Sequence, residues 1–346
     1  MHLKHLSPIA PMGLALLLAL SSGLTHAQSA QTAESAAGAA PAGAPVELKP
    51  QPARPSPAAA QASLLGAARA GQRIVAVGDY GTVLLSDDEG KTLRQAAQVP
   101  VSSTLTAVTF ADAKNGWAVG HWGAILHTAD GGQSWKIQRI DTHEDRPLFS
   151  VHFFNAQEGV AVGLWSLVLR TQDGGQTWNK VEMPAPPEGG RADRNLFKAF
   201  ASSKGTLYVA AERGLVLRSD DRGQSWTYLK TGYKGSFWTG LALQDGTLLV
   251  AGLRGTVYRS SDEGRSWQSA VSDSKSSVTD LVQVGSRVLG TALDGVQLSS
   301  DDQGQHFAWK QRDDRLSLTA LLPVQGGGVL RLSKHGVLHD EARATP

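Results

Sequence analysis

Apolar and polar residues alternate in short stretches along most of the chain, and turn-forming residues separate these stretches. Residues 105–110 read LTAVTF, and comparable stretches follow at 116–120, 124–128 and 134–140. A period of two places alternate side chains on opposite faces of an extended chain, so each stretch predicts a β-strand. The 38 glycines suit the tight turns between such strands. The pattern therefore predicts an all-β protein of short antiparallel strands.

A motif of the form Ser/Thr-x-Asp-x-Gly-x-Ser/Thr-Trp recurs six times, and we call it the Asp box. The first and last copies lack the tryptophan, and the last also lacks the Ser or Thr before it. Successive copies lie 40 to 48 residues apart, which is the length of a four-stranded propeller blade. The central aspartates are Asp88, Asp130, Asp173, Asp221, Asp262 and Asp302.

A second motif precedes each box: a small residue, two variable residues and usually a glycine, followed by an apolar strand. We call the two variable residues the tip of the blade. A seventh copy, at 333–340, has no box after it. Seven hairpins and six boxes predict a seven-bladed β-propeller over residues 63–346. The tips are Asp79-Tyr80, His121-Trp122, Leu164-Trp165, Glu212-Arg213, Leu253-Arg254, Leu293-Asp294 and Lys334-His335.

We expect the Asp boxes to be structural. A short aspartate side chain can accept backbone N–H bonds within a tight turn, and the glycine tolerates positive φ. Catalytic or Ca²⁺-binding boxes are the alternative, but a Ca²⁺ loop of the EF type needs several alternating oxygen ligands and a terminal glutamate.

The last blade is short of one strand. Its first three strands are expected at 316–324, 329–333 and 336–340, which leaves no room for the outermost one. Residues 46–49 alternate like a strand and could close the ring by supplying it. The alternative is that blade 7 has three strands.

The N-terminal region is expected to lie outside the fold. Lys4, the apolar run 12–20 and the small residues that end at Ala27 read as a signal peptide, residues 1–27, cleaved after Ala27. Residues 28–62 are rich in Ala, Pro, Gln and Ser and predict a disordered linker. We therefore expect a periplasmic or secreted, monomeric protein without stable membrane insertion.

Composition argues against several kinds of chemistry. The chain has no cysteine, a net charge of only +2 and no basic stripe, so a thiol nucleophile, a disulfide framework and nucleic-acid binding are not expected. Its histidines are scattered, and only His335 and His339 are four residues apart. We expect no metal site and no cofactor.

Candidate partner-binding residues lie on the tips and on the loops between blades. Tyr, Trp and Arg are enriched at binding hot spots, and loops on a rigid scaffold commonly carry recognition. Arg170, Arg218 and Arg259, just before their boxes, predict either a basic patch for an acidic partner or surface arginines paired on their strands. The longer loops are 141–147, 184–197 and 230–238, and the remaining candidates are Tyr80, Trp122, Trp165, Arg213, Trp238 and Arg254.

The repeat at 148–178 resembles that of the photosystem II assembly/stability factor family and its bacterial relatives. The shared features are Phe, a downstream Gly-x-x-Val-Gly and the box, at 110–135 and 153–178, and the resemblance extends over about 64–340. It implies a seven-bladed propeller without catalytic residues or cofactor, which helps a membrane complex to assemble.

We therefore expect a non-catalytic, exported scaffold that binds an exported or membrane-bound protein. The alternative is a sialidase-like glycoside hydrolase or a carbohydrate-binding propeller, because such proteins also carry Asp boxes. That chemistry needs paired carboxylates, for which Asp79, Glu212 and Asp294 on the tips are the candidates. The chain has only five tyrosines and no Arg-Ile-Pro motif near its start, which argues against the sialidase reading.

Overall fold

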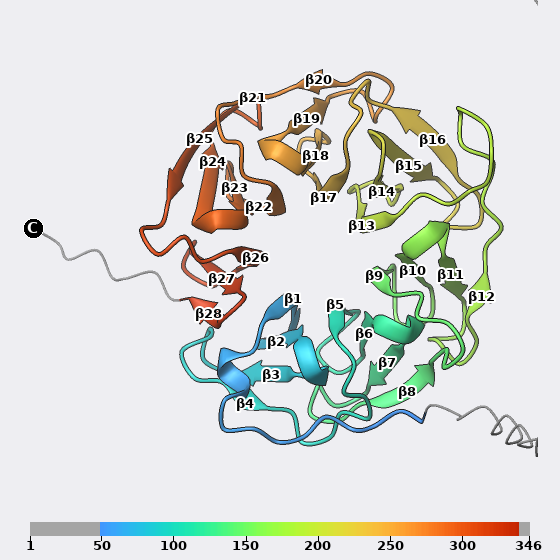
Figure 1. Cartoon of the computed structure of the whole chain (residues 1–346), viewed down its shortest axis with the longest axis vertical. Coiled ribbons are helices and arrows are strands. Elements are labelled where there is room, and N and C mark those ends of the chain that lie inside the picture. The colour runs from blue at the N-terminus through green and yellow to red at the C-terminus, as the bar shows by residue number, and fades with distance from the viewer. Residues whose placement is uncertain (1–48, 339–346) are drawn as a thin grey trace, which may run out of the picture. The chain divides into compact units, whose positions relative to one another are not determined.

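The computed structural model describes residues 49–338, and within this range the chain forms seven antiparallel sheets around a common centre (Figure 1). Each sheet is one blade, and consecutive blades follow one another in sequence. The predicted seven-bladed β-propeller is confirmed. The predicted signal peptide lies outside the described residues.

In blades 1 to 4, the four strands lie side by side in chain order. These strands are β1 (Leu64–Ala70), β2 (Arg73–Gly78), β3 (Val83–Ser86), β4 (Arg94–Gln95); β5 (Leu105–Phe110), β6 (Gly116–Gly120), β7 (Ile125–Thr128), β8 (Lys136–Arg139); β9 (Leu148–Phe153), β10 (Gly159–Gly163), β11 (Val168–Thr171), β12 (Asn179–Lys180); and β13 (Leu196–Ala201), β14 (Leu207–Ala211), β15 (Leu215–Ser219), β16 (Thr227–Lys230).

Blade 5 follows the same plan, and blades 6 and 7 vary it. The segment after blade 5 adds β21, which pairs in parallel with the outermost strand of blade 6, and blade 7 shows three strands within the described residues. The strands are β17 (Phe237–Ala242), β18 (Leu248–Gly252), β19 (Val257–Ser260), β20 (Gln268–Ser269); β21 (Val271–Ser272), β22 (Val278–Val284), β23 (Arg287–Ala292), β24 (Val296–Ser300), β25 (His306–Gln311); and β26 (Leu318–Pro323), β27 (Val329–Ser333), β28 (Gly336–Leu338).

Short 3-10 helices complete the described elements. One of them, η1, precedes blade 1, and the other five form tips of blades. They are η1 (Ala59–Gln61), η2 (Asp79–Gly81), η3 (His121–Gly123), η4 (Leu164–Ser166), η5 (Leu253–Gly255) and η6 (Leu293–Gly295).

The first strand of each blade is the innermost one. These strands contact one another in turn around the centre, and β26 contacts β1, so the ring is closed. At this closure the Thr319 hydroxyl donates to the carbonyl oxygen of Leu64 at 2.5 Å, and Arg69 donates to the carbonyl oxygen of Pro323. A cluster of buried apolar residues from blades 7 and 1, including Leu332 and Ile74, fills the interface behind them.

The predicted closing strand 46–49 lies almost wholly outside the described residues. Val46 to Leu48 lie outside the described residues, and Lys49 lines a small cavity beside Trp122 in blade 2. The described end of the predicted linker, 49–62, packs on the propeller instead of being disordered. The Ala53 N–H donates to Val99 at 3.0 Å, Ala59 is buried, and η1 lies beside β28.

A buried carboxylate links three blades near the centre. Asp280 on β22 accepts hydrogen bonds from the Thr239 hydroxyl of blade 5 at 3.1 Å and from the Leu321 N–H of blade 7 at 3.0 Å. Its side chain is 8% exposed and lies 3.4 Å from the ammonium group of Lys198 in blade 4. Buried charges are stable only when they are paired and hydrogen-bonded, and Asp280 meets both conditions.

The six Asp boxes share one geometry. In each, the first hydroxyl donates to the aspartate at 2.8 Å and accepts the N–H of the box glycine. The other carboxylate oxygen accepts the second hydroxyl, and in the last box His306 takes that place at 2.6 Å. These contacts give the boxes the structural role that the sequence predicts.

Each box also contacts the preceding blade. The carbonyl oxygen of the residue after the aspartate accepts a hydrogen bond from a side chain of that blade at five successive interfaces. Arg170, Arg218 and Arg259 make three of these bonds, at 2.9, 3.1 and 3.1 Å. The remaining two come from Arg73 and Trp117. The three arginines, predicted either as a basic patch or as arginines paired on their strands, therefore connect blades, and Arg170 and Arg218 also pair with Glu158 and Asp220 of their own blades.

The tips hold an uncommon backbone conformation. The second tip residue has φ between 51° and 59° in blades 1 to 6, although none of these residues is glycine. In blades 1, 2, 3 and 5 the residue before the tip is glycine, because the backbone just before the first strand of the blade passes close by; a Cβ on Gly120 would lie 2.1 Å from the Thr104 carbonyl oxygen. The strained residues are Tyr80, Trp122, Trp165, Arg213, Arg254 and Asp294.

Replacing Asp280 by alanine is expected to destabilise the protein by about 2–4 kcal/mol, because two buried donors in blades 5 and 7 lose their acceptor. The measurement is urea unfolding followed by tryptophan fluorescence. Asp313, which is exposed, provides the matched control, and its replacement by alanine should change stability by less than about 0.5 kcal/mol. Equal effects of the two variants would contradict the linking role of Asp280.

Acid is expected to weaken the boxes. Hydrogen bonds from the Thr177 hydroxyl and N–H lower the pKa of Asp173 from 3.8 to about 2. A carboxyl group whose pKa is lower in the folded state stabilises the fold above its unfolded pKa, and this contribution disappears as the pH falls from about 4 towards 2. The Tm difference between the wild type and Asp173→Asn should therefore shrink over this range. A Tm difference that stays constant from pH 6 to pH 2 would contradict a stabilising role of the ionised Asp173 carboxylate.

Relief of tip strain is expected to stabilise the fold. Arg254 is exposed, has φ 58° and makes its tip contact through its backbone N–H, so Arg254→Gly should raise the free energy of unfolding by about 0.5–1 kcal/mol. Arg265 is exposed without a positive φ, and Arg265→Gly should lower that free energy. Chemical denaturation of both variants is the test, and a loss of stability in Arg254→Gly would show that the tip is unstrained.

Candidate functional site

The predicted tip residues differ in how far they reach solvent. Tyr80 and Trp165 are 78% and 50% exposed, and Arg213 and Arg254 are also exposed. Trp122 is partly buried, and it lines the small cavity together with Lys49 and Ile140. The accessible aromatic tips are therefore those of blades 1 and 3.

Trp238 does not lie with the tips. It is on β17, the innermost strand of blade 5, and it lines a central cavity of about 280 Å³ together with Phe149, Phe197 and Asp280. The loop before it lies against the blade 5 tip, since the Tyr233 hydroxyl donates to the carbonyl oxygen of Leu253 at 3.2 Å. The prediction that 230–238 is a recognition loop misplaces the start of the strand.

Side chains from the neighbouring loops fix the tips of blades 2 and 3. Asp145 accepts the Trp122 N–H at 2.6 Å and lies 2.9 Å from the His121 ring nitrogen. Asn195 accepts the Trp165 N–H at 3.1 Å and itself donates to Glu212 in the next tip at 2.9 Å. The predicted loops 141–147 and 184–197 thus hold adjacent tips in fixed positions.

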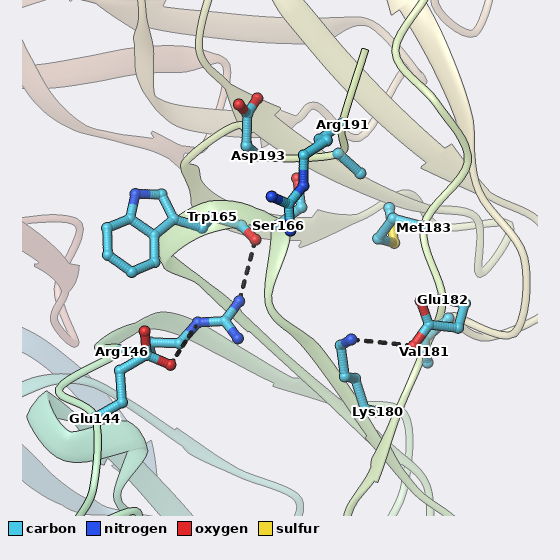
Figure 2. Close-up of a pocket in the computed structure, with 11 residues that line it drawn as sticks. Glu144, Arg146, Trp165, Ser166, Lys180, Val181, Glu182, Met183, Arg191 and Asp193 are labelled. Carbon is cyan, nitrogen blue, oxygen red and sulfur yellow. Dashed lines mark hydrogen bonds and ion pairs between the residues drawn. The ribbon is translucent and has the colours of Figure 1, made fainter.

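A cavity of about 530 Å³ opens beside the tip of blade 3 (Figure 2). Its volume falls within the range of small-molecule and peptide-side-chain sites. Four segments meet there: the loop before blade 3, the blade 3 tip, the chain after β12 and the loop before blade 4. The lining residues are Glu144, Arg146, Trp165, Ser166, Lys180, Val181, Glu182, Met183, Arg191, Ala192 and Asp193, and we call this cavity the tip pocket.

Arg146 and Trp165 form the centre of the tip pocket. The guanidinium carbon of Arg146 lies 6.0 Å from the centre of the Trp165 ring, and Nη2 donates to the Trp165 carbonyl oxygen at 3.2 Å. Figure 2 shows the arginine directed toward that carbonyl group. Its Nε is buried and has no hydrogen-bond partner within residues 49–338, although Glu144 lies 3.9 Å away.

The wall of the tip pocket is rigid because Arg194 anchors it. The backbone of Arg194 exchanges hydrogen bonds with Ser166, at 2.7 Å from the Ser166 N–H and 3.0 Å to the Ser166 hydroxyl. Its buried guanidinium group pairs with Glu188 at 2.6 Å and with Asp193. The hydrogen bond with Glu188 raises the pKa of Arg194 and lowers that of Glu188. The loop is thereby held against the blade 3 tip before any ligand binds.

The pocket offers mixed chemistry. Lys180 pairs with Glu182 at 3.0 Å, whereas Arg191 is exposed and has no ion pair among the described residues. The indole of Trp165 and the thioether of Met183 supply apolar surface. An apolar surface flanked by both signs of charge suits a polypeptide segment, which presents apolar side chains and backbone acceptors together.

The tip carboxylates considered for glycosidase chemistry hold loops. Asp79 accepts the Thr104 hydroxyl at 3.0 Å, Glu212 accepts the Asn195 N–H at 3.0 Å, and Asp294 accepts the Ser276 hydroxyl at 3.2 Å. They belong to blades 1, 4 and 6. Within residues 49–338 no group of three or more His, Cys, Asp or Glu side chains is placed to hold a metal ion. The described helices also include none long and apolar enough to cross a membrane.

Trp165 is the pocket residue that was predicted individually from the sequence, and Arg146, Met183 and Arg191 are among those that were not. Arg146 and Arg191 lie in the loops 141–147 and 184–197, which the sequence does mark as candidates for recognition. No periodicity or motif distinguishes one residue of such a loop from its neighbours, and the pairing of Arg146 with Trp165 depends on the fold of blade 3.

Comparison with known proteins supports the predicted resemblance. The family model of the photosynthesis system II assembly factor YCF48 matches residues 94–190, which include blade 2 and the tip of blade 3. A search of curated proteins finds no matching sequence. Among solved structures, YCF48 bound to a D1 peptide shares 19% identity and covers 80% of this chain and 92% of its own, with a TM-score of 0.66.

A second solved structure gives the same picture. YCF48 from Cyanidioschyzon merolae shares 16% identity and covers 82% of this chain and 95% of its own, with a TM-score of 0.65. At these identities the two structures establish a common fold. By its repeats over residues 94–190, and by its propeller fold over most of its length, the chain is similar to the YCF48 family of photosystem II assembly factors, as its sequence predicts.

Proposed function

We propose that the chain is an exported, monomeric and non-catalytic scaffold that binds a segment of a membrane-associated protein in the tip pocket and assists the assembly of the complex to which that protein belongs. The observation that carries this proposal is the exposed, strained Trp165 stacked near Arg146 at the mouth of a rigid pocket. Strained residues persist where the surrounding structure enforces them, and they concentrate at functional sites.

The chemistry of the pocket favours a peptide segment. Tryptophan and arginine are the side chains most often responsible for binding energy at protein interfaces. Arg191 is exposed and has no ion pair among the described residues, so the pocket offers a cation for carboxylate or backbone carbonyl groups. One of the similar structures is of YCF48 bound to a D1 peptide, which supports a protein ligand for this fold.

The family resemblance supports the cellular role. The match to an assembly-factor family covers residues 94–190, and these residues include Arg146, Trp165 and Lys180. The apolar run 12–20 supports export. We do not extend the proposal to the glycosidase alternative, because each of the three candidate carboxylates holds a loop of its own blade or its neighbour.

The test is capture of the partner. The tagged full-length mature chain is incubated with detergent-solubilised native envelope, and the bound proteins are quantified by mass spectrometry. Trp165→Ala should reduce recovery of an enriched membrane-associated protein about tenfold or more, because truncation of a central interface tryptophan costs about 2 kcal/mol.

Val271→Ala is the control, because Val271 is an apolar residue that is 56% exposed and lies on β21, outside the lining of the tip pocket. It should leave recovery unchanged, and thermal unfolding should show that both variants are folded. Recovery that is insensitive to Trp165→Ala and to Arg146→Ala would overturn the assignment of the tip pocket.

A further inference from the structure

The interface between blades 6 and 7 is unlike the others. Buried apolar clusters bridge every other pair of neighbouring blades within residues 49–338, and none bridges this pair. A cleft of about 460 Å³ lies there instead, lined by β23, β24 and β25 on one side and by β26, β27 and the turn before β27 on the other. We call it the 6/7 cleft.

The difference coincides with the absence of an Asp box in blade 7. At five interfaces, the Asp box of one blade accepts a hydrogen bond from the blade before it. Blade 7 has no box, and no strand lies beyond β28 among the described residues. Arg287 repeats the arrangement of Arg73, since each pairs with an aspartate of its own blade, at 2.9 and 2.6 Å. Arg73 also reaches the next box, and Arg287 faces the 6/7 cleft.

The blade 6 wall is polar where other blades are apolar. In blades 1 to 5 the third strand places an apolar residue opposite the next-to-last residue of the second strand. These residues are Val83, Ile125, Val168, Val216 and Val257. In blade 6 the residue at this position is Gln297, which pairs with Thr291. The Gln297 Oε1 is buried and has no hydrogen-bond partner within the described chain. A buried acceptor without a donor is costly, so this position fits an occupant that brings an N–H group.

The charge of the lining is one-sided. Arg287, Lys310 and Arg331 line the 6/7 cleft, and none of its lining residues is acidic. Lys310 is exposed and has no ion pair among residues 49–338. Apolar surface comes from Leu289, Leu321, Val329 and the half-exposed Trp309. An occupant should therefore combine carboxylates with apolar side chains.

We propose that the 6/7 cleft is a second binding surface, which accepts an extended, acidic segment of a partner protein in the place of the absent box and fourth strand. Blade 7 shows three strands among residues 49–338, and strand addition is a common mode of peptide recognition. Carboxylates of the segment would pair with Lys310 and Arg287, and one of its N–H groups would satisfy Gln297. This surface is separate from the tip pocket, and its occupation does not depend on the function proposed there.

The test uses a short fluorescein-labelled peptide that alternates valine with aspartate, titrated with the full-length mature chain and followed by fluorescence anisotropy. A matched peptide alternates valine with lysine. The acidic peptide should bind saturably and the basic one should not. Lys310→Glu should weaken binding of the acidic peptide about tenfold or more, because it replaces attraction by repulsion.

Gln297→Val separates binding from folding. It restores the residue type found in blades 3 to 5, so the Tm should stay the same or rise, while peptide binding weakens through loss of the acceptor. Lys180→Glu in the tip pocket is the control for location and should leave binding unchanged. Equal binding of both peptides, or binding that Lys180→Glu reduces and Lys310→Glu does not, would overturn the proposal.

A variant chain that ends at Leu338 distinguishes a separate partner from the chain's own C-terminal residues as the occupant of the 6/7 cleft. Residues 339–346 follow β28 and contain Asp340 and Glu341. If the acidic peptide binds with similar affinity to this chain and to the full-length chain, a separate partner is supported. Binding that appears only after removal of these residues would overturn the proposal, because the chain's own tail would then occupy the 6/7 cleft.

Discussion

The propeller depends on hydrogen bonds that run from one blade into the Asp box of the next. A box residue with positive φ turns its carbonyl oxygen toward the preceding blade, where an arginine or tryptophan donates to it. The box aspartate cannot reach that blade itself; it fixes the turn so that the carbonyl group points the right way. The local hydrogen bonds of each turn thus help to set how neighbouring sheets pack. Apolar clusters fill the interfaces between sheets that are positioned in this way.

The same dependence explains the difference between the two candidate surfaces. On the tip side, the loops before blades 3 and 4 supply Asp145, Asn195 and Arg194, which hold the tips firmly and leave Trp165 displayed. At the end of the repeat the box is absent, and the surface that it would cover stays partly open. The tip pocket depends on extra contacts from its loops, whereas the 6/7 cleft depends on the absence of an Asp box. Both surfaces therefore arise where the chain departs from its regular repeat.

The repeat made the fold predictable, and its regularity also limited the prediction of the site. Box spacing and seven hairpins suffice for a seven-bladed ring, and the box hydrogen bonds are local enough to follow from the motif. The role of Arg170, Arg218 and Arg259 was not predictable, because each acceptor lies 44 to 52 residues further along the chain. Trp238 was predicted to lie in a loop, because an aromatic residue at a strand boundary is equally compatible with the loop and with the strand. The path of Lys49 past blade 2 depends on tertiary packing that no alternation of residues encodes.

Closure of the ring by β1 and β26 has a consequence for the order of folding. The hydrogen bond between Thr319 and Leu64 joins residues 255 positions apart, whereas the hairpins within a blade join near neighbours. Chain entropy opposes distant contacts more strongly than local ones, so blades can form during synthesis while the joint must wait for the last of them.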